Sequence, residues 1–258
     1  MNKYLPLAII LAALIAGPAN AAPAQPPSFY NGFEVEGGLI APNEIDHGGP
    51  GRDGIPALDH PVFHQGAARD NAIKPGDRVM GVRYNGVAKA YPIAILEHHE
   101  IVNDTYALTP LTITFCPLCG TGMVFQAEAA NQVLNFGVSG LIYNSDMLLY
   151  DRNTQSLWSQ ILKQAVTGPL KGTQLTQVPA QYTTWAAWSQ QHPDSLLLSD
   201  DTGFERDYAA SPYEEYKRLP MVMYSPLPSD WRLPGQPGAA GLSSGDRNVA
   251  RPFVGLGK

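Results

Sequence analysis

The segment from Val79 to Tyr91 is the sequence feature that most restricts the fold. Two apolar runs, Val79–Tyr84 and Val87–Tyr91, flank the dipeptide Asn85-Gly86. Asn-Gly accepts positive φ at both central positions of a type I′ turn, so this pattern predicts a β-hairpin.

Strands and turns dominate the rest of the prediction. The chain holds 25 Gly and 23 Pro among 258 residues, which is above average usage and indicates many turns and short strands. Further strands are predicted over residues 111–115, 123–125, 132–136 and 147–150, where apolar residues alternate or cluster between turn residues.

Two helices are predicted. The first follows Pro92 and runs from Ile93 to His98 or His99. The second is capped by Thr184, carries Trp185 and Trp188 on one face, and ends before Pro193. The pattern predicts a mainly β (α+β) fold, a single β-rich domain with a few short helices. The order of the strands cannot be derived from it.

The first 21 residues have the pattern of a secretory signal peptide. Lys3 precedes an apolar stretch from Leu5 to Ala16, and Ala19-Asn20-Ala21 matches the site of signal peptidase. The stretch is too short to span a bilayer, although an uncleaved N-terminal anchor is the alternative. We therefore expect an exported protein, periplasmic or secreted, with no stable membrane insertion after cleavage.

The remaining chain is divided by composition. Residues 22–45 are predicted to be a flexible leader, 46–232 a β-rich domain, and 233–258 a Gly/Pro-rich, disordered tail that is either native or the product of a frameshift. The formal net charge is −6 without a cluster of Lys and Arg, which argues against a nucleic-acid partner. Composition does not indicate an oligomeric state.

The motif Cys116-Pro117-Leu118-Cys119-Gly120 is the most chemically informative part of the sequence. It lies between two predicted strands, as a metal-binding knuckle does, and it holds both cysteines of the chain. A knuckle supplies two ligands, so the others must come from elsewhere. His98 or His99 and the thioether of Met123 are candidates, and this soft donor set suits copper, while thiolates with imidazole also suit zinc.

Two other interpretations of the cysteines stay open. In an oxidising compartment the pair can form a structural disulfide, although closing so short a loop stabilises a fold only modestly. The pair can also be redox-active. A redox C-x-x-C motif usually opens a helix, however, whereas a strand is predicted after Gly120-Thr121-Gly122.

Several strings of the sequence match a known family. They span residues 48 to 225, most of the chain, and include Asp53-Gly54-Ile55-Pro56-Ala57-Leu58, His99-Glu100-Ile101-Val102-Asn103-Asp104, Thr114-Phe115-Cys116-Pro117-Leu118-Cys119-Gly120, Phe136-Gly137-Val138-Ser139-Gly140, Tyr150-Asp151-Arg152 and Ser156-Leu157-Trp158-Ser159-Gln160. On these strings the chain resembles the prokaryotic family catalogued as domain of unknown function 3179.

The resemblance implies little about activity, because the family is named for having none assigned. It does favour His99 over His98 as the third ligand, since His99 lies inside a matching string. After residue 234 the family leads us to expect another strand pair, in place of which this sequence has its Gly/Pro-rich tail.

Three functions follow as hypotheses. The first is a metal-binding protein, copper before zinc, with Cys116, Cys119, His99 and Met123 as ligands and a metal-delivery partner in the periplasm. The second is a thiol-disulfide oxidoreductase that uses the two cysteines, with His99 as a nearby base and a redox partner. The third is a ligand-binding module with a structural disulfide, whose cleft is lined by Trp158, Tyr150, Asp151 and Arg152.

Overall fold

The computed structural model of the chain describes residues 28–218. The predicted signal peptide and the predicted tail at 233–258 lie outside the described residues. So do the strand pair expected after residue 234, the start of the predicted leader at residue 22 and the end of the predicted domain at residue 232. No helix among the described residues is long and apolar enough to cross a membrane.

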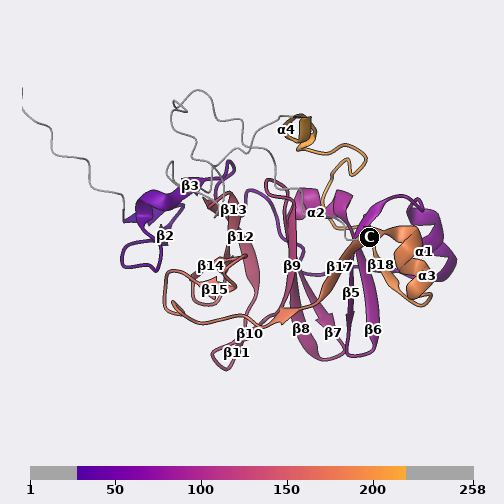
Figure 1. Cartoon of the computed structure of the whole chain (residues 1–258), viewed down its shortest axis with the longest axis horizontal. Helices are drawn as coiled ribbons and strands as arrows, with labels where there is room; N and C mark the ends of the chain where they lie inside the picture. Colours follow the sequence, from indigo (N-terminus) through magenta and orange to yellow (C-terminus); the bar gives the residue numbers. More distant parts are fainter. Residues whose placement is uncertain (1–27, 219–258) are drawn as a thin grey trace, which may run out of the picture.

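Strands dominate the described part of the chain, as predicted (Figure 1). A central antiparallel sheet has the order β16 (Gln177–Val178), β9 (Thr121–Gln126), β8 (Thr109–Cys116) and β7 (Ile101–Tyr106). A second sheet has the order β17 (Ala180–Thr184), β5 (Arg78–Tyr84), β6 (Val87–Pro92), β18 (Leu196–Leu198) and β4 (Phe63–His64), and only β6 and β18 pair in parallel.

A third sheet and two small hairpins complete the strands. The third sheet has the order β15 (Gln164–Ala165), β14 (Leu157–Ser159), β13 (Asp146–Asp151), β12 (Phe136–Tyr143) and β3 (Ile45–His47). The small hairpins are β1 (Phe29–Tyr30) with β2 (Phe33–Glu34), and β10 (Glu128–Ala129) with β11 (Gln132–Val133). The helices are the 3-10 turn η1 (Pro42–Glu44) and α1 (Gly66–Ala72), α2 (Ile93–His99), α3 (Trp185–Gln191) and α4 (Glu214–Arg218).

The local predictions of the hairpin and the helices are confirmed. Asn85 and Gly86 have φ of 47° and 80°, as a type I′ turn between β5 and β6 requires. Helix α2 begins directly after Pro92, and the side chain of Thr184 accepts a hydrogen bond from the amide of Ala187 at the start of α3.

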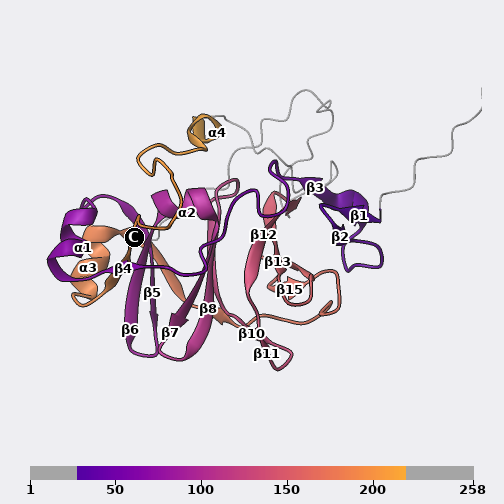
Figure 2. The ribbon, with the colours of Figure 1, turned by 180° about the vertical axis from the view of Figure 1, so that it is seen from behind.

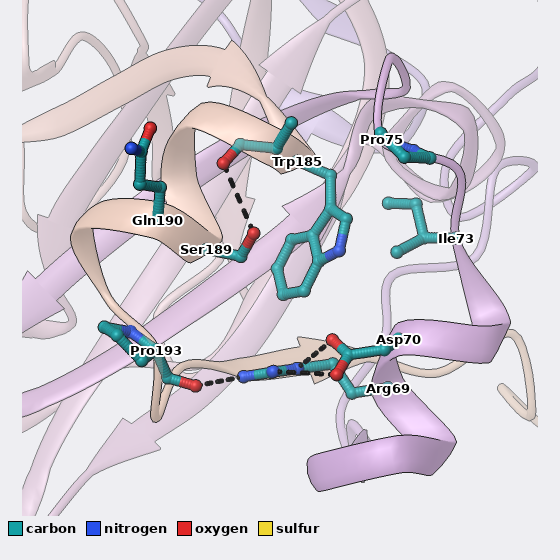
Figure 3. Close-up of a pocket in the computed structure, with 9 residues that line it drawn as sticks. Arg69, Asp70, Ile73, Pro75, Trp185, Ser189, Gln190 and Pro193 are labelled. Atoms are coloured by element: carbon teal, nitrogen blue, oxygen red, sulfur yellow. Dashed lines mark hydrogen bonds and ion pairs between the residues drawn. The ribbon is translucent and has the colours of Figure 1, made fainter.

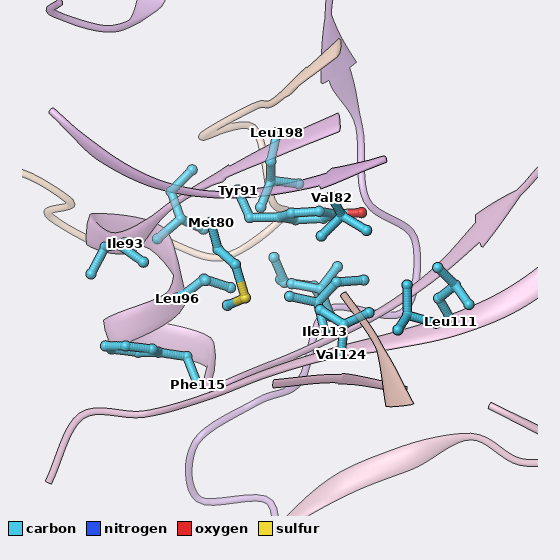
Figure 4. Packing of buried hydrophobic residues seen from close by; sticks show 14 of the residues in the cluster. Met80, Val82, Tyr91, Ile93, Leu96, Leu111, Ile113, Phe115, Val124 and Leu198 are labelled. Atoms are coloured by element: carbon cyan, nitrogen blue, oxygen red, sulfur yellow. The ribbon is translucent and has the colours of Figure 1, made fainter. Parts of the chain in front are cut away.

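The central sheet is buried on both faces. Successive side chains of β8 point to opposite sides, and other side chains cover each side. On one side Leu111, Ile113 and Phe115 pack with side chains of β5, β6 and α2 (Figure 4). On the other side Cys116 and, from β9, Phe125 pack with side chains of the third sheet, such as Trp158. The three sheets therefore form layers around β8 and β9 (Figure 1).

The structure corrects two boundaries of the prediction. Residues 28–45 belong to the folded part of the chain rather than to a flexible leader, because Phe33, Val35 and Ile40 are buried against side chains of β13 and β14. Figure 2 shows β1, β2 and β3 on the side of the molecule that holds β12 and β13. The predicted strand 132–136 is divided between β11 and β12. The chain bends between them, where the amide of Asn135 bonds to the side chain of Asn153 at 3.2 Å.

A buried ion pair links the second sheet to the central one. The Nζ of Lys89 on β6 lies 2.8 Å from both carboxylate oxygens of Asp104 on β7, and the two side chains are 8% and 7% exposed. The hydroxyl of Tyr91 donates to the same carboxylate at 2.5 Å and also contacts the hydroxyl of Tyr106. The charge of this carboxylate is therefore compensated inside the fold.

We expect Lys89→Met to lower the free energy of unfolding by about 3–5 kcal/mol, because it leaves the carboxylate of Asp104 buried without its cation. Urea unfolding of the full chain measures this loss. The control is Arg218→Met, which breaks an exposed pair with Glu214 and should cost less than about 0.5 kcal/mol. Equal losses in the two variants would contradict the assigned role of Lys89.

Candidate metal centre

Two hairpin turns meet beside the end of the central sheet. The turn from β8 to β9 contains the second cysteine; the amide of Gly120 bonds to the carbonyl of Cys116 at 2.8 Å, and Gly120 has a positive φ of 69°. In the turn from β12 to β13, Asn144 and Ser145 have φ of 51° and 62°. The Sγ of Cys116 lies 3.9 Å from the carbonyl oxygen of Ser145, so the two turns are in contact.

This contact brings together two thiols and a carboxyl group. The Sγ atoms of Cys116 and Cys119 and a carboxylate oxygen of Asp146 all lie within 4.8 Å of one another. Both cysteines are free thiols, and Cys119 Sγ lies 3.2 Å from Asp146 Oδ1. Cys116 and Asp146 are 1% and 2% exposed, whereas Cys119 is exposed. The cluster therefore reaches the surface through Cys119.

Neighbouring segments hold the cluster in place. The amide of Ile161, two residues beyond β14, donates to Asp146 Oδ2 at 3.2 Å. The hydroxyl of Tyr216 on α4 donates to the carbonyl of Leu118 at 2.8 Å and so fixes the turn between the two cysteines. Both sides of the cluster are therefore fixed by segments that come later in the sequence.

The electrostatics of the cluster are dominated by buried acids. Burial, together with the neighbouring Cys119, raises the pKa of Asp146 to about 9. A hydrogen bond from Cys116, helped by hydrogen bonds from Thr121, lowers the pKa of Cys119 to about 6. The same Cys116–Cys119 contact and burial raise the pKa of Cys116. Cys119 is thus the thiol that ionises first.

A further buried acid, Glu100, lies close enough to interact with the thiols. Burial raises its pKa to about 7, against a hydrogen bond from the hydroxyl of Tyr213 that lowers it, and the charge of Cys119 adds to the rise. No ion pair among residues 28–218 includes Asp146 or Glu100. These acids therefore differ from Asp104, whose charge is compensated by Lys89.

His99 is not part of the cluster formed by Cys116, Cys119 and Asp146. Its ring is fully buried, with Nδ1 2.8 Å from the carbonyl oxygen of Pro56 and Nε2 2.7 Å from the hydroxyl of Tyr208. Because both ring nitrogens are engaged there, His99 connects the segment between β3 and β4 to the segment before α4. Burial lowers its pKa, which favours the neutral form of the ring.

Met123 lies on the same face of the β8–β9 hairpin as Cys116. The register pairs Cys116 with Thr121 and Thr114 with Met123, and the side chain of Met123 is half-buried against the cluster that includes Cys116. The structure is compatible with the sequence expectation for Met123, whose role as a ligand stays a prediction.

The predicted cleft around Trp158 is not found. Trp158, Tyr150 and Asp151 are buried, and the indole Nε1 of Trp158 donates to Asp151 Oδ2 at 2.8 Å. Arg152 donates to Asp59 at 2.7 Å. These side chains are engaged within the fold instead of lining an opening, because Trp158 bonds to Asp151, Tyr150 to Asp53 and Arg152 to Asp59.

A surface pocket of about 480 Å³ lies between α1 and α3 and is lined by Arg69, Asp70 and Trp185 (Figure 3). The guanidinium of Arg69 donates to Asp70 and to the carbonyl of Pro193 (Figure 3). Its hydrogen bonds are thus made inside the protein, and the pocket offers no free cation to a ligand.

The sequence matches one known protein family. The family described as "Protein of unknown function (DUF3179)" matches residues 52–257, which is most of the chain. The chain belongs to this family. No curated protein and no solved structure matches it. The DUF3179 match includes both cysteines, Asp146 and Glu100, but the family description assigns no activity to them.

Asp146 is the residue that sequence reasoning missed in this DUF3179 chain. An acid beside a turn is normally solvated, and the sequence supports that interpretation of Asp146. Its burial results from the packing of the β12–β13 turn against the β8–β9 turn, where the contacting residues Cys119 and Asp146 are 27 positions apart in sequence. The only local sign is that a charged residue opens an otherwise apolar strand, Met147–Tyr150.

We expect the stability of Asp146→Asn, relative to the unaltered chain, to rise with pH in metal-free protein. The pKa of Asp146 is about 9 in the folded state and 3.8 ordinarily, so its contribution to the free energy of unfolding is complete below pH 4 and is lost as the pH rises through 9. Asparagine has no proton to lose. Urea unfolding from pH 4 to 9 measures the difference, and Glu205→Gln, at an exposed acid, is the control. A difference that does not change with pH would contradict the buried, protonated carboxyl.

Proposed function

We propose that this DUF3179 protein binds a thiophilic metal ion through Cys116, Cys119 and Asp146. The observation that carries the proposal is that two sulfur atoms and a buried carboxylate lie within 4.8 Å of one another. Buried acids are normally paired with a cation or coordinate a metal. Since no ion pair of residues 28–218 supplies that cation, Asp146 keeps its proton in the metal-free chain, and a metal ion that displaces this proton is the partner that we propose.

The donor set favours zinc over copper. Two thiolates and one carboxylate are ordinary zinc ligands, whereas the sequence argument for copper depended on imidazole and thioether donors. His99 is engaged elsewhere, which removes the imidazole from that set. The hydrogen bonds from Thr121 to Cys119 support a thiolate at this position. Copper, with Met123 as an added ligand, stays the alternative metal.

We further propose that the protein works outside the cytoplasm, in the periplasm or as a secreted protein. This proposal rests on the signal-peptide pattern of residues 1–21. In such a compartment a centre with one exposed thiolate suits storage or delivery of a metal, and a metal-delivery protein is the partner that we propose.

Elemental analysis of the tag-free chain tests the metal proposal. Protein from its native compartment, and protein reconstituted anaerobically with Zn(II) or Cu(I), should hold about one metal per chain. Cys116→Ser, Cys119→Ser and Asp146→Asn should each lose most of it, because each removes one of the ligands. The control His99→Ala should keep the metal. Full occupancy in both cysteine variants would contradict the site.

Thiol-disulfide exchange is a second candidate function, favoured by the different exposure of the two thiols. Cys119 is exposed with a lowered pKa, and Cys116 is buried with a raised pKa, as in pairs where one thiol attacks and the other resolves. The Cys119 thiolate would attack a partner disulfide and release one partner thiolate. Cys116 would then lose its proton and attack the Cys119 sulfur, which releases the second partner thiolate and forms the Cys116–Cys119 disulfide. The partner disulfide is reduced by two electrons.

Insulin reduction by metal-free protein tests the second candidate. Cys119→Ser should abolish the activity, and Cys116→Ser should trap a mixed disulfide with the substrate. Protein that contains no metal, has no free thiol and does not reduce insulin would instead support the third hypothesis, a structural disulfide.

A further inference from the structure

The surroundings of the thiol pair include a buried side-chain amide, that of Gln160. This residue follows β14 and is fully buried. Its Nε2 donates to the hydroxyl of Thr114 at 2.7 Å and lies 3.5 Å from the carbonyl oxygen of Thr121. Thr114 lies two residues before Cys116 on the same face of β8, and Thr121 pairs with Cys116 across the hairpin. Gln160 therefore reaches from the third sheet to the base of the cysteine turn.

The other end of this amide has no partner. Gln160 Oε1 is buried without a hydrogen bond in the part of the chain that the structure describes. Exchanging the nitrogen and oxygen does not repair this. The hydroxyl of Thr114 already donates to the carbonyl of Met123 at 2.8 Å, so it must accept from Gln160, and this fixes Nε2 on that side.

A second unpartnered oxygen belongs to another residue next to the cluster. The hydroxyl of Ser145 is buried and unbonded among residues 28–218, and Ser145 is 4% exposed. Its carbonyl oxygen is the one that Cys116 Sγ approaches, and its neighbour in sequence is Asp146. The residue after Gln160, Ile161, holds Asp146 through its amide. Both oxygens therefore belong to residues directly joined to the ligand cluster.

Three protein ligands leave one position free on a tetrahedral metal ion, and zinc centres of this kind carry a water or substrate there. A water on a metal donates two hydrogen bonds, and it needs two acceptors nearby. We propose that Gln160 Oε1 and Ser145 Oγ accept the hydrogen bonds of an exchangeable water at that position. Gln160 and Ser145 are thus positioning residues, and the centre is open to a small exogenous ligand. The inference rests on the proposed metal centre.

The full chain loaded with Co(II), which takes the place of Zn(II) and absorbs visible light, provides the test. Solvent-proton relaxation reports an exchangeable water on the metal, and a titration with azide, followed in the visible spectrum, reports how easily the water is displaced. Azide donates no hydrogen bond to Gln160 or Ser145. Removing either acceptor therefore weakens the binding of the water to the metal but not the binding of azide.

We expect Gln160→Met to bind azide about three- to tenfold more tightly than the unaltered chain, the change that one lost hydrogen bond produces, with Co(II) stoichiometry unchanged. Ser145→Gly should shift azide binding in the same direction, and glycine suits the positive φ of 62° at this position. It keeps the inference testable when Gln160→Met does not fold.

The matched control is Thr112→Val. Thr112 also has a buried hydroxyl without a partner in the described chain, and it lies on the same face of β8, about 13 Å along the strand from Cys116. Its removal should leave azide binding unchanged. A Co(II)-loaded chain without an exchangeable water would overturn the inference, and so would Gln160→Met and Ser145→Gly variants that bind azide as Thr112→Val and the unaltered chain do. Neither result would contradict the metal centre. An unaltered chain that takes up no Co(II) overturns the metal centre, and the water site with it.

Discussion

The burial of the central sheet on both faces is the constraint on which the rest of the structure depends. Side chains of β8 alternate between two apolar layers, one shared with β5, β6 and α2 and the other with β12 to β14. A polar or reactive group is costly inside either layer unless it is paired. Reactive side chains are therefore expected where the strands of the sheet end. The turn from β8 to β9 is such an end, and it carries the thiols.

The buried carboxyl groups of Asp104 and Asp146 have different surroundings. Asp104 is held by Lys89 and by the hydroxyl of Tyr91, so its charge is compensated and it serves to join two sheets. Asp146 is as deeply buried, yet its nearest acidic neighbour is the thiol of Cys119 at 3.2 Å. A carboxyl beside an acid, without a basic partner, adds nothing to the fold by charge pairing. It is suited instead to receive a cation from outside.

Segments that follow the cysteines in sequence decide how the site is shaped. The amide of Ile161 donates a hydrogen bond to Asp146, and the hydroxyl of Tyr216 donates one to the carbonyl of Leu118. The hydroxyl of Tyr208 is hydrogen-bonded to the ring of His99. The last of these contacts explains why His99, 17 residues before Cys116, is not part of the cluster. In Figure 1, helix α4 and the segment that leads to it lie over α2, which is the side from which His99 and Glu100 come. The centre is thus assembled from several layers rather than from one motif.

Local patterns predicted much of this molecule correctly. The β5–β6 hairpin, the helix after Pro92, the helix capped by Thr184 and the position of the cysteine motif between two strands all depend on residues within a few positions of one another. Steric and hydrogen-bonding preferences act at that range, and they are visible in the sequence. The folding of residues 28–45 was missed because their strands are too short to show a period.

By itself, the sequence determined that this is a β-rich DUF3179 chain with its two thiols on a turn. Only the tertiary structure decided which carboxylate stands beside those thiols, that His99 does not, and that Trp158 is interior. The reason is physical: a turn conformation is set by its own residues, whereas the neighbours of that turn are set by how separate sheets pack. Packing of separate sheets depends on the shapes of whole apolar surfaces, which no single stretch of the sequence contains.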